Sequence, residues 1–298
     1  MAKAINSAKL IAHLKHGLGS LANALVARPR NFTPKIYKYY PYPSSQAGYK
    51  LNSPAPVGRE LGTTDFPVPP QDLRPGYGST VEDWLSGGKR DIDTMLKLVT
   101  SPDFDIREGS RILDLGCQSG RMIRWLANRV AACEIWGVDV SARHIVWCQE
   151  NMSLPFNFAT VTTLPHLPFE DNYFDLVYCG SVFTHIDDLS DAWLLEVKRI
   201  MRKGGRAYIT VHDNHTLDFV LNRRAQWVET FRNYLLSYDK KLNFTQSNYY
   251  KFCIAPGTPD TNVFYDIDYL RQHWGRVLQI VSVTPEAYGY QTAVVMQK

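Results

Sequence analysis

The sequence predicts an α/β protein with a doubly wound, mostly parallel sheet that ends in an antiparallel β-hairpin. Short apolar segments alternate with amphipathic ones from residue 111 onward, and a glycine-containing turn follows the first apolar segment. The last two apolar segments are separated by Tyr288-Gly289-Tyr290. Alternating strands and helices indicate βαβ units, whose crossovers pair the strands in parallel.

Each expected element has its own pattern. Helical spacing resumes at Thr80, and Pro102 ends it. Apolar runs then predict strands at 111–115, 133–138, 156–161, 174–179 and 206–211. Between them, periodic segments predict helices at 119–130, 141–151 and 189–202. We expect a C′ glycine in Lys203-Gly204-Gly205 to stop the last helix, and strands at 277–283 and 292–297 to form the hairpin.

Charge is distributed unevenly along the chain. The net charge of +4 hides eight basic residues and no acidic residue in residues 1–50. The remainder therefore holds 25 basic residues against 29 acidic ones. The main domain is not predicted to present a nucleic-acid-binding surface.

Composition excludes several other classes. No run approaches the roughly 18 consecutive apolar residues of a membrane span, and the start lacks the pattern of a secretory signal. The five cysteines are odd in number and form no CxxC pair. Reduced thiols in the cytoplasm are the simplest interpretation, and neither a disulfide framework nor a metal site is expected.

Residues 1–79 are predicted to be an N-terminal extension of a main domain at residues 80–298. Within the extension, residues 4–27 are predicted to form an amphipathic helix with leucines on one face. We favour packing of this helix on its own domain or on a partner subunit. Peripheral contact with an anionic membrane and an organelle-targeting role are the alternatives. Residues 31–80, rich in Pro, Tyr, Ser and Gly, form an extended arm that we expect to lie across the domain.

A nucleotide site is predicted where Arg111-Ile-Leu-Asp-Leu-Gly-Cys-Gln-Ser-Gly120 passes from a strand into a turn. Gly116 and Gly120 allow a sharp turn and close approach to a ligand. Asp139 ends the next strand about 20 residues later, where a carboxylate can accept both hydroxyls of a ribose. The G-x-G-x-x-G pattern of dinucleotide sites fails at Gln118 and Arg121, which disfavours a nicotinamide-dependent oxidoreductase.

The segment resembles motif I of the class I S-adenosylmethionine-dependent methyltransferases, with Gln118 in place of the middle glycine. Leu167-Pro168-Phe169 before the fourth strand, Lys203-Gly204-Gly205 before the fifth and the terminal hairpin are similar to later segments of that family. The resemblance covers roughly residues 80–298. It implies a seven-stranded sheet in the order 3-2-1-4-5-7-6 and S-adenosylmethionine as the cofactor.

The resemblance also implies a set of binding residues. Asp139 holds the ribose, the turn lines the methionine end, Thr163 stands where the family often has an acid for adenine, and the segment after strand four closes over the cofactor. The expected contacts are Asp114, Gly116, Cys117, Gln118, Ser119, Gly120, Asp139, Val140, Thr163, Leu164, Gly180 and Ser181. Asp175 is expected to stabilise the fold instead.

His185 and His212 follow strands four and five, where ligands of open α/β sheets bind. Because an unperturbed histidine titrates near neutrality, we predict them as catalytic bases or substrate-orienting groups. A cap at His185 and packing at His212 are the alternatives. The segment Cys179-Gly180-Ser181-Val182 lacks the Asn/Asp/Ser-Pro-Pro-Tyr/Phe motif typical of enzymes that methylate amines of DNA bases.

An aromatic-rich insertion is predicted at residues 214–262, either as a substrate lid or as a scaffold extension with its own core. The sequence thus predicts transfer of a methyl group to a small-molecule, glycan or lipid hydroxyl, amine or carboxyl. The alternative is a non-catalytic subunit of the same fold that acts as a binding or docking module.

Overall fold

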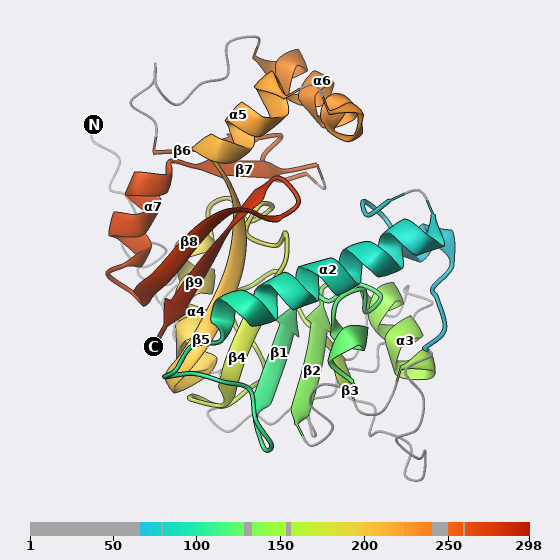
Figure 1. The fold of residues 1–298 in the computed structure, drawn as a ribbon, viewed down its shortest axis with the longest axis vertical. Coiled ribbons are helices and arrows are strands. Elements are labelled where there is room, and N and C mark those ends of the chain that lie inside the picture. The colour runs from blue at the N-terminus through green and yellow to red at the C-terminus, as the bar shows by residue number, and fades with distance from the viewer. Residues whose placement is uncertain are drawn as a thin grey trace, which may run out of the picture.

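The computed structural model describes residues 66–78, 80–127, 133–152, 156–223, 225–239, 250–258 and 260–298 (Figure 1). The predicted helix at residues 4–27 and most of the arm lie outside the described residues. The division of the chain at residue 80 therefore stays a prediction.

A central sheet organises the described part of the chain. Its strands are β1 (Arg111–Leu115), β2 (Glu134–Asp139), β3 (Phe156–Thr160), β4 (Phe174–Cys179), β5 (Met201–Asp213), β6 (Lys251–Ile254), β7 (Asn262–Tyr265), β8 (Gln279–Tyr288) and β9 (Gln291–Gln297).

The strand order confirms the predicted class of fold. Strands β3-β2-β1-β4-β5 pair in parallel, and the antiparallel hairpin continues the sheet from β5 through β9 to β8. This is the predicted order 3-2-1-4-5-7-6 with the hairpin as its last two strands. The predicted count of seven is too low, because β7 also pairs with the end of β5 and carries β6. Strand β6 lies in the predicted insertion and β7 begins at its last residue, and the sequence patterns assigned no strand to either segment.

Helices cover both faces of the sheet (Figure 1). The α-helices are α2 (Val81–Val99), α3 (Ala142–Asn151), α4 (Ser190–Ile200), α5 (Asn214–Asn222), α6 (Glu229–Tyr238) and α7 (Ile267–Trp274). Short 3-10 helices are η2 (Gln71–Leu73), η3 (Ile123–Leu126) and η4 (Gln226–Val228). Side-chain caps from Thr80, Ser141 and Asp213 start α2, α3 and α5, because each accepts a backbone N–H of the first turn.

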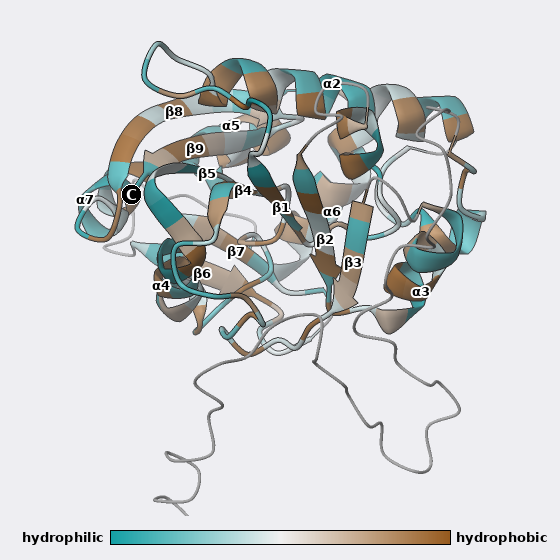
Figure 2. Cartoon of the chain, turned by 90° about the horizontal axis from the view of Figure 1, so that it is seen from below, coloured by the Kyte–Doolittle hydropathy of each residue, from teal (hydrophilic) through white to brown (hydrophobic). Residues whose placement is uncertain are grey.

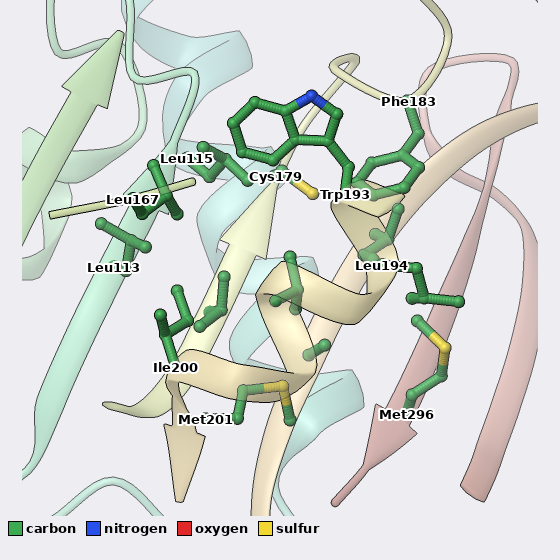
Figure 3. Close-up of a cluster of buried hydrophobic side chains, with 14 of the residues drawn as sticks. Leu113, Leu115, Leu167, Cys179, Phe183, Trp193, Leu194, Ile200, Met201 and Met296 are labelled. Atoms are coloured by element: carbon green, nitrogen blue, oxygen red, sulfur yellow. The ribbon is translucent and has the colours of Figure 1, made fainter. Parts of the chain in front are cut away.

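Alternate strand residues enter two separate cores, as the pleat of a sheet requires. Leu113 and Leu115 of β1 pack with Trp193 of α4 (Figure 3), whereas Ile112 packs with Ile92 of α2. Strands β2 and β4 are buried along almost their whole length, whereas hydrophilic residues interrupt the hydrophobic ones in strands such as β5 (Figure 2). Strands buried on both faces are what a doubly wound sheet demands.

Two predicted helix boundaries are wrong. The expected helix at 119–130 is a turn followed by η3 in its described part. Helix α4 ends at Ile200, and β5 begins at once with Met201 in an extended conformation. Gly204 does have a positive φ of 76°, but its N–H donates to the carbonyl of Lys298. The glycines therefore shape a strand edge beside the C-terminus and do not cap the helix.

The insertion lies over the carboxyl ends of the central strands (Figure 1). Helices α5 and α6 and strands β6 and β7 enclose a third apolar cluster built on Leu217, Val228, Leu235 and Phe264. The insertion thus has a core of its own, one of the two predicted alternatives. No helix within the described ranges is long and apolar enough to cross a membrane.

Candidate functional site

The turn after β1 is held in an uncommon backbone conformation. Gly116, Gln118 and Gly120 have φ values of 84°, 47° and 79°. A Cβ at Gly116 would lie 2.4 Å from Cγ2 of Val182, so only glycine fits there without movement. Gln118, which replaces the family's middle glycine, adopts a left-handed conformation that costs a non-glycine residue about 1–2 kcal/mol.

Asp139 at the end of β2 holds this turn in place. Its Oδ2 accepts the N–H of Gln118 at 2.9 Å, and its Oδ1 accepts the N–H of Ser141 at 2.7 Å. Burial raises the pKa of Asp139, whereas these backbone N–H groups oppose the rise. Each carboxylate oxygen accepts one of these bonds and has a second lone pair for a ligand hydroxyl. The aspartate thus fixes the turn and keeps acceptor capacity.

A pocket opens between the turn, strand β4 and the terminal hairpin. It is lined by Tyr77, Asp114, Gly116, Cys117, Gln118, Arg121, Met122, Gly180 and Tyr288. Asp114 is buried, and Tyr178 donates a hydrogen bond to it at 2.9 Å. Burial, together with the negative charge of Asp139, raises the pKa of Asp114 to about 7 against the lowering effect of Tyr178. The pocket floor therefore carries acidic groups beside an open backbone turn.

A buried arginine closes one side of the pocket. Arg121 pairs with Asp91 of α2 at 2.7 Å and donates to the hydroxyl of Tyr288 at 2.5 Å. Its guanidinium lies 3.9 Å from the ring centroid of Tyr77, and Tyr288 donates to the Tyr77 hydroxyl at 2.8 Å. The positive charge is thus paired and stacked, as a buried cation must be.

The described part of the arm lies across the domain, as predicted for it. Ser119 donates to the carbonyl of Leu73 at 2.5 Å, and Arg124 donates to the carbonyl of Pro67 at 2.9 Å. The Ser119 side chain therefore faces the arm and not the pocket. Tyr77, at the end of this stretch, is the arm's contribution to the pocket lining.

Apolar side chains stand exposed on the far side of Asp139. Val140 is 56% exposed and Leu164 is 64% exposed, although both follow strands at the ligand-binding edge. Thr163 is exposed beside Leu164, and its carbonyl accepts the indole N–H of Trp193 at 3.2 Å. Thr163 is the position predicted to stand beside the adenine ring, and Val140 and Leu164 belong to the predicted cofactor contacts.

The segment after β4 is fixed by side-chain hydrogen bonds. A Cβ at Gly180 would lie 2.7 Å from the ring of Tyr288, so the glycine allows the hairpin to approach. Ser181, with a φ of 59°, donates its N–H to Thr210 at 2.7 Å and accepts from Gln291 at 2.8 Å. Gly180 lines the pocket, whereas the Ser181 side chain joins the strands beside it. Asp175 accepts the N–H of Arg111 at 2.8 Å, consistent with its predicted structural role.

His212 is not at the rim where sequence reasoning placed it. It is 2% exposed and packs against Phe231, Phe264 and Tyr290. Within the described chain, neither ring nitrogen has a hydrogen-bond partner. Burial lowers the pKa of His212 to about 3, so the ring is neutral at neutral pH. His212 therefore packs in the core of the insertion, which was the alternative to its predicted catalytic role.

Two other histidines do face solvent at this edge. His185 is exposed, and its Nδ1 lies 2.6 Å from the carbonyl oxygen of Thr261. Since a carbonyl only accepts, Nδ1 carries the proton and Nε2 is the basic nitrogen. His215 lies 2.9 Å from the carboxylate of Glu286. No three His, Cys, Asp or Glu side chains gather as a metal site anywhere in the described ranges.

Sequence reasoning missed several pocket residues. Tyr77 lay in an arm without a periodic pattern, and Arg121 was used only to reject the dinucleotide motif. A signal did exist, because Asp91 falls on the buried face of α2 with Trp84, Met95 and other apolar residues. A carboxylate on an apolar helix face needs a buried cation as partner.

Taken together, the parallel sheet, the glycine turn and the acid at the end of β2 define a class I methyltransferase fold. Residues 113–209 match the family described as a methyltransferase domain. The chain thus contains a methyltransferase domain with the predicted class I fold.

Curated relatives align over this same region. The ubiquinone/menaquinone biosynthesis C-methyltransferase UbiE of Chromobacterium violaceum is 30% identical over 135 residues, which are 43% of this chain and 52% of that protein. The 2-phytyl-1,4-naphtoquinone methyltransferase of Nostoc punctiforme is 29% identical over 134 residues, 43% of this chain and 56% of that protein. The chain spans about half the length of these curated relatives.

Solved structures agree on the fold. A protein from Pyrococcus horikoshii superposes with a TM-score of 0.52 at 15% identity, over 76% of this chain and 96% of that one. A structure described as a putative S-adenosylmethionine dependent methyltransferase from Listeria monocytogenes gives 0.50 at 14% identity, over 70% of this chain and 99% of that one. These likenesses show the fold, and the methyltransferase domain match agrees with S-adenosylmethionine as the cofactor.

Proposed function

We propose that this chain transfers a methyl group from S-adenosylmethionine to an oxygen or nitrogen of a small-molecule, glycan or lipid acceptor. The observation that carries the proposal is the bond between Asp139 and the N–H of Gln118. It joins a carboxylate that can accept ribose hydroxyls to a turn whose glycines, Gly116 and Gly120, allow Val182 and Met152 to pack closely against the backbone. The Asp139 carboxylate and the backbone turn together therefore fit a nucleoside with a zwitterionic tail.

Binding roles follow from what each side chain offers. Asp139 accepts the two ribose hydroxyls, and the exposed Val140 and Leu164 cover the adenine faces beside Thr163. Gly116, Cys117, Gln118 and Gly180 take the methionine end, where the carboxylate of the ligand pairs with Arg121. Ser119, Gly120 and Ser181 hold the turns that shape the pocket.

Bound S-adenosylmethionine supplies a methyl group that is already activated on a sulfonium. The protein's tasks are then to align the acceptor, exclude water and move one proton. His185 is suited to orient the acceptor, because its Nδ1–H is fixed by Thr261 and its Nε2 is a hydrogen-bond acceptor. Buried His212 packs against the rings of Phe231, Phe264 and Tyr290.

The relatives favour a small apolar acceptor over a macromolecular one. Two are named for quinones, and a third, from Mycolicibacterium smegmatis, is a fatty-acid O-methyltransferase that is 30% identical over 98 residues. These proteins share the domain and differ in acceptor. They support the reaction class, and the acceptor of this chain is inferred below from its own residues.

Calorimetric titration with S-adenosylhomocysteine tests the proposal. We expect Asp139→Ala to weaken binding roughly 100-fold or more, because charge-assisted hydrogen bonds contribute about 1.5–3 kcal/mol each and two are lost. Asp171→Ala removes a 69% exposed acid far from the turn and should bind as wild type. The proposal fails if the wild-type chain does not bind at millimolar ligand, or if folded Asp139→Ala, checked by circular dichroism, binds equally well.

A further inference from the structure

Helix α5 turns one polar and aromatic face toward the terminal hairpin. His215, Phe219 and Arg223 are spaced four residues apart, so they lie along one side of the helix and its C-terminal end. Glu286 of the hairpin accepts from His215 at 2.9 Å and from Arg223 at 2.8 Å. Glu286 has a φ of 54°, an uncommon conformation that these two contacts help to hold.

An exposed aromatic wall adjoins these charges. Trp227 is 61% exposed and stacks on Tyr290, with ring centroids 5.6 Å apart and an interplanar angle of 17°. Phe231 stacks on the same tyrosine at 5.4 Å and 16°. The guanidinium of Arg223 lies 4.4 Å from the ring centroid of Phe219, which itself packs 5.5 Å from Trp227. An indole left this open to water provides a flat apolar surface for a ligand.

The wall is continuous with the cofactor pocket. Tyr290 and Tyr288 belong to the same hairpin, and Tyr288 lines the pocket with Tyr77. Thr216 donates to the carbonyl of Tyr290 at 2.9 Å, which anchors α5 on the hairpin. Tyr288, two residues before Tyr290, donates a hydrogen bond to the Tyr77 hydroxyl at 2.8 Å. A ligand on the wall therefore lies next to the methionine end of the pocket.

Among the three histidines near this edge, His215 alone contacts a carboxylate. His185 contacts a carbonyl oxygen, and His212 is enclosed by rings. A carboxylate stabilises the imidazolium that forms when histidine takes a proton, and it fixes which nitrogen stays basic. With Nε2–H directed to Glu286, Nδ1 of His215 is the nitrogen that accepts.

We propose that the methyl acceptor is a flat apolar ring system with an ionisable hydroxyl, which lies on Trp227 and Tyr290 and gives its proton to His215. The inference rests on the proposed function. His215 Nδ1 takes the hydroxyl proton, the oxygen forms a bond to the methyl carbon, and the carbon–sulfur bond breaks with its electron pair on sulfur. Glu286 is a positioning residue that holds the imidazolium until the proton passes to solvent.

A binding experiment with 2-naphthol as the probe tests the aromatic wall without turnover. The dissociation constant is measured by calorimetry with S-adenosylhomocysteine present. Trp227→Ala should weaken naphthol binding tenfold or more. Tyr250→Ala is the matched control, because Tyr250 is 62% exposed and stacks on Tyr269 at 4.8 Å, outside the wall. Equal affinities of wild type and Trp227→Ala, or no naphthol binding to the wild type, would overturn the proposal.

The spectrum of bound naphthol tests His215 and Glu286 separately, because naphtholate and naphthol absorb differently. In the wild type, bound naphthol should ionise at least one pH unit lower than in His215→Gln, with Glu286→Gln in between. Identical titrations in all three proteins would overturn the assignment of the base.

Binding of S-adenosylhomocysteine is measured in parallel to separate the two proposals. If Trp227→Ala loses naphthol binding but still binds S-adenosylhomocysteine, the result supports the acceptor site. If the wild type binds naphthol through Trp227 but not S-adenosylhomocysteine, the ring site stands and methyl transfer fails.

Discussion

The two halves of the ligand-binding edge are built from opposite kinds of side chain. Beside β1 and β2 the structure buries charge, with Asp114, Asp139, Asp91 and Arg121 all less than 10% exposed. Beside β5 and β7 it buries rings, and even the histidine among them, His212, is held neutral. Buried charge suits a ligand that is itself ionic and hydrogen-bonded, whereas buried rings suit an apolar one.

Under the proposed function, the charged half of the edge binds the methyl donor and the aromatic half binds the acceptor. The charged half belongs to strands whose turns resemble the family's motif, and the aromatic half belongs to the insertion and hairpin. A fold can thus keep the donor site constant and change the acceptor site by changing appended segments. The stability of the aromatic half should depend on keeping a buried ring neutral, and that of the charged half on keeping a buried charge paired.

The largest expected effect concerns His212 and acid stability. An unfolded histidine titrates near 6.5, whereas burial lowers the pKa of His212 to about 3. The unfolded state therefore binds the extra proton first as pH falls from 6.5 to 3, and the free energy of unfolding drops by about 5 kcal/mol across that window. His212→Phe removes this term and should unfold at lower pH than wild type in acid titrations followed by circular dichroism. Replacing exposed His166 by Phe should leave the acid midpoint unchanged, and an unchanged midpoint for His212→Phe would contradict the burial.

In the charged half, Arg121→Met should cost about 3–5 kcal/mol of unfolding free energy, because it leaves the buried Asp91 with only a 3.9 Å pair to the exposed Arg90. The double variant Arg121→Met/Asp91→Asn should recover part of that loss in urea unfolding. Lys89→Gln, which breaks the exposed pair with Asp93, should cost at most about 1 kcal/mol. If Lys89→Gln and Arg121→Met lose similar amounts of unfolding free energy, the buried pair contributes no more to stability than the exposed one.

The smallest expected effect distinguishes backbone conformation from contact at the turn. Gly116→Ala and Gly204→Ala both place alanine at positive φ, 84° and 76°, but only Gly116 has a neighbour within 4 Å of the added Cβ. Gly204→Ala should cost about 1–2 kcal/mol for conformation alone, and Gly116→Ala about 1–3 kcal/mol more for the contact with Val182. Only Gly116→Ala should also weaken S-adenosylhomocysteine binding, and equal behaviour of the two variants would refute the close approach.

Local patterns were sufficient for the parallel part of the fold. The apolar strands at 111–115 and 174–179 and the helix starting after Thr80 were predicted within a residue of their bounds, because apolar periodicity and capping act over a few residues. Strand β7 was missed because it pairs with the end of β5, far away in sequence. Strand β6, which pairs only with β7, was missed with it.

The sequence by itself determined the glycine turn and Asp139, since each depends on residues close together in the chain. The order of the strands, which rests on pairings between distant segments, was implied only by the resemblance to the family. Only the tertiary structure decided that Arg121 would pair with Asp91, that Tyr77 and Tyr288 would meet, and that His212 would be enclosed while His215 reached Glu286. Those contacts join segments up to 211 residues apart. Burial and charge pairing depend on how elements pack in space, and no local pattern encodes them.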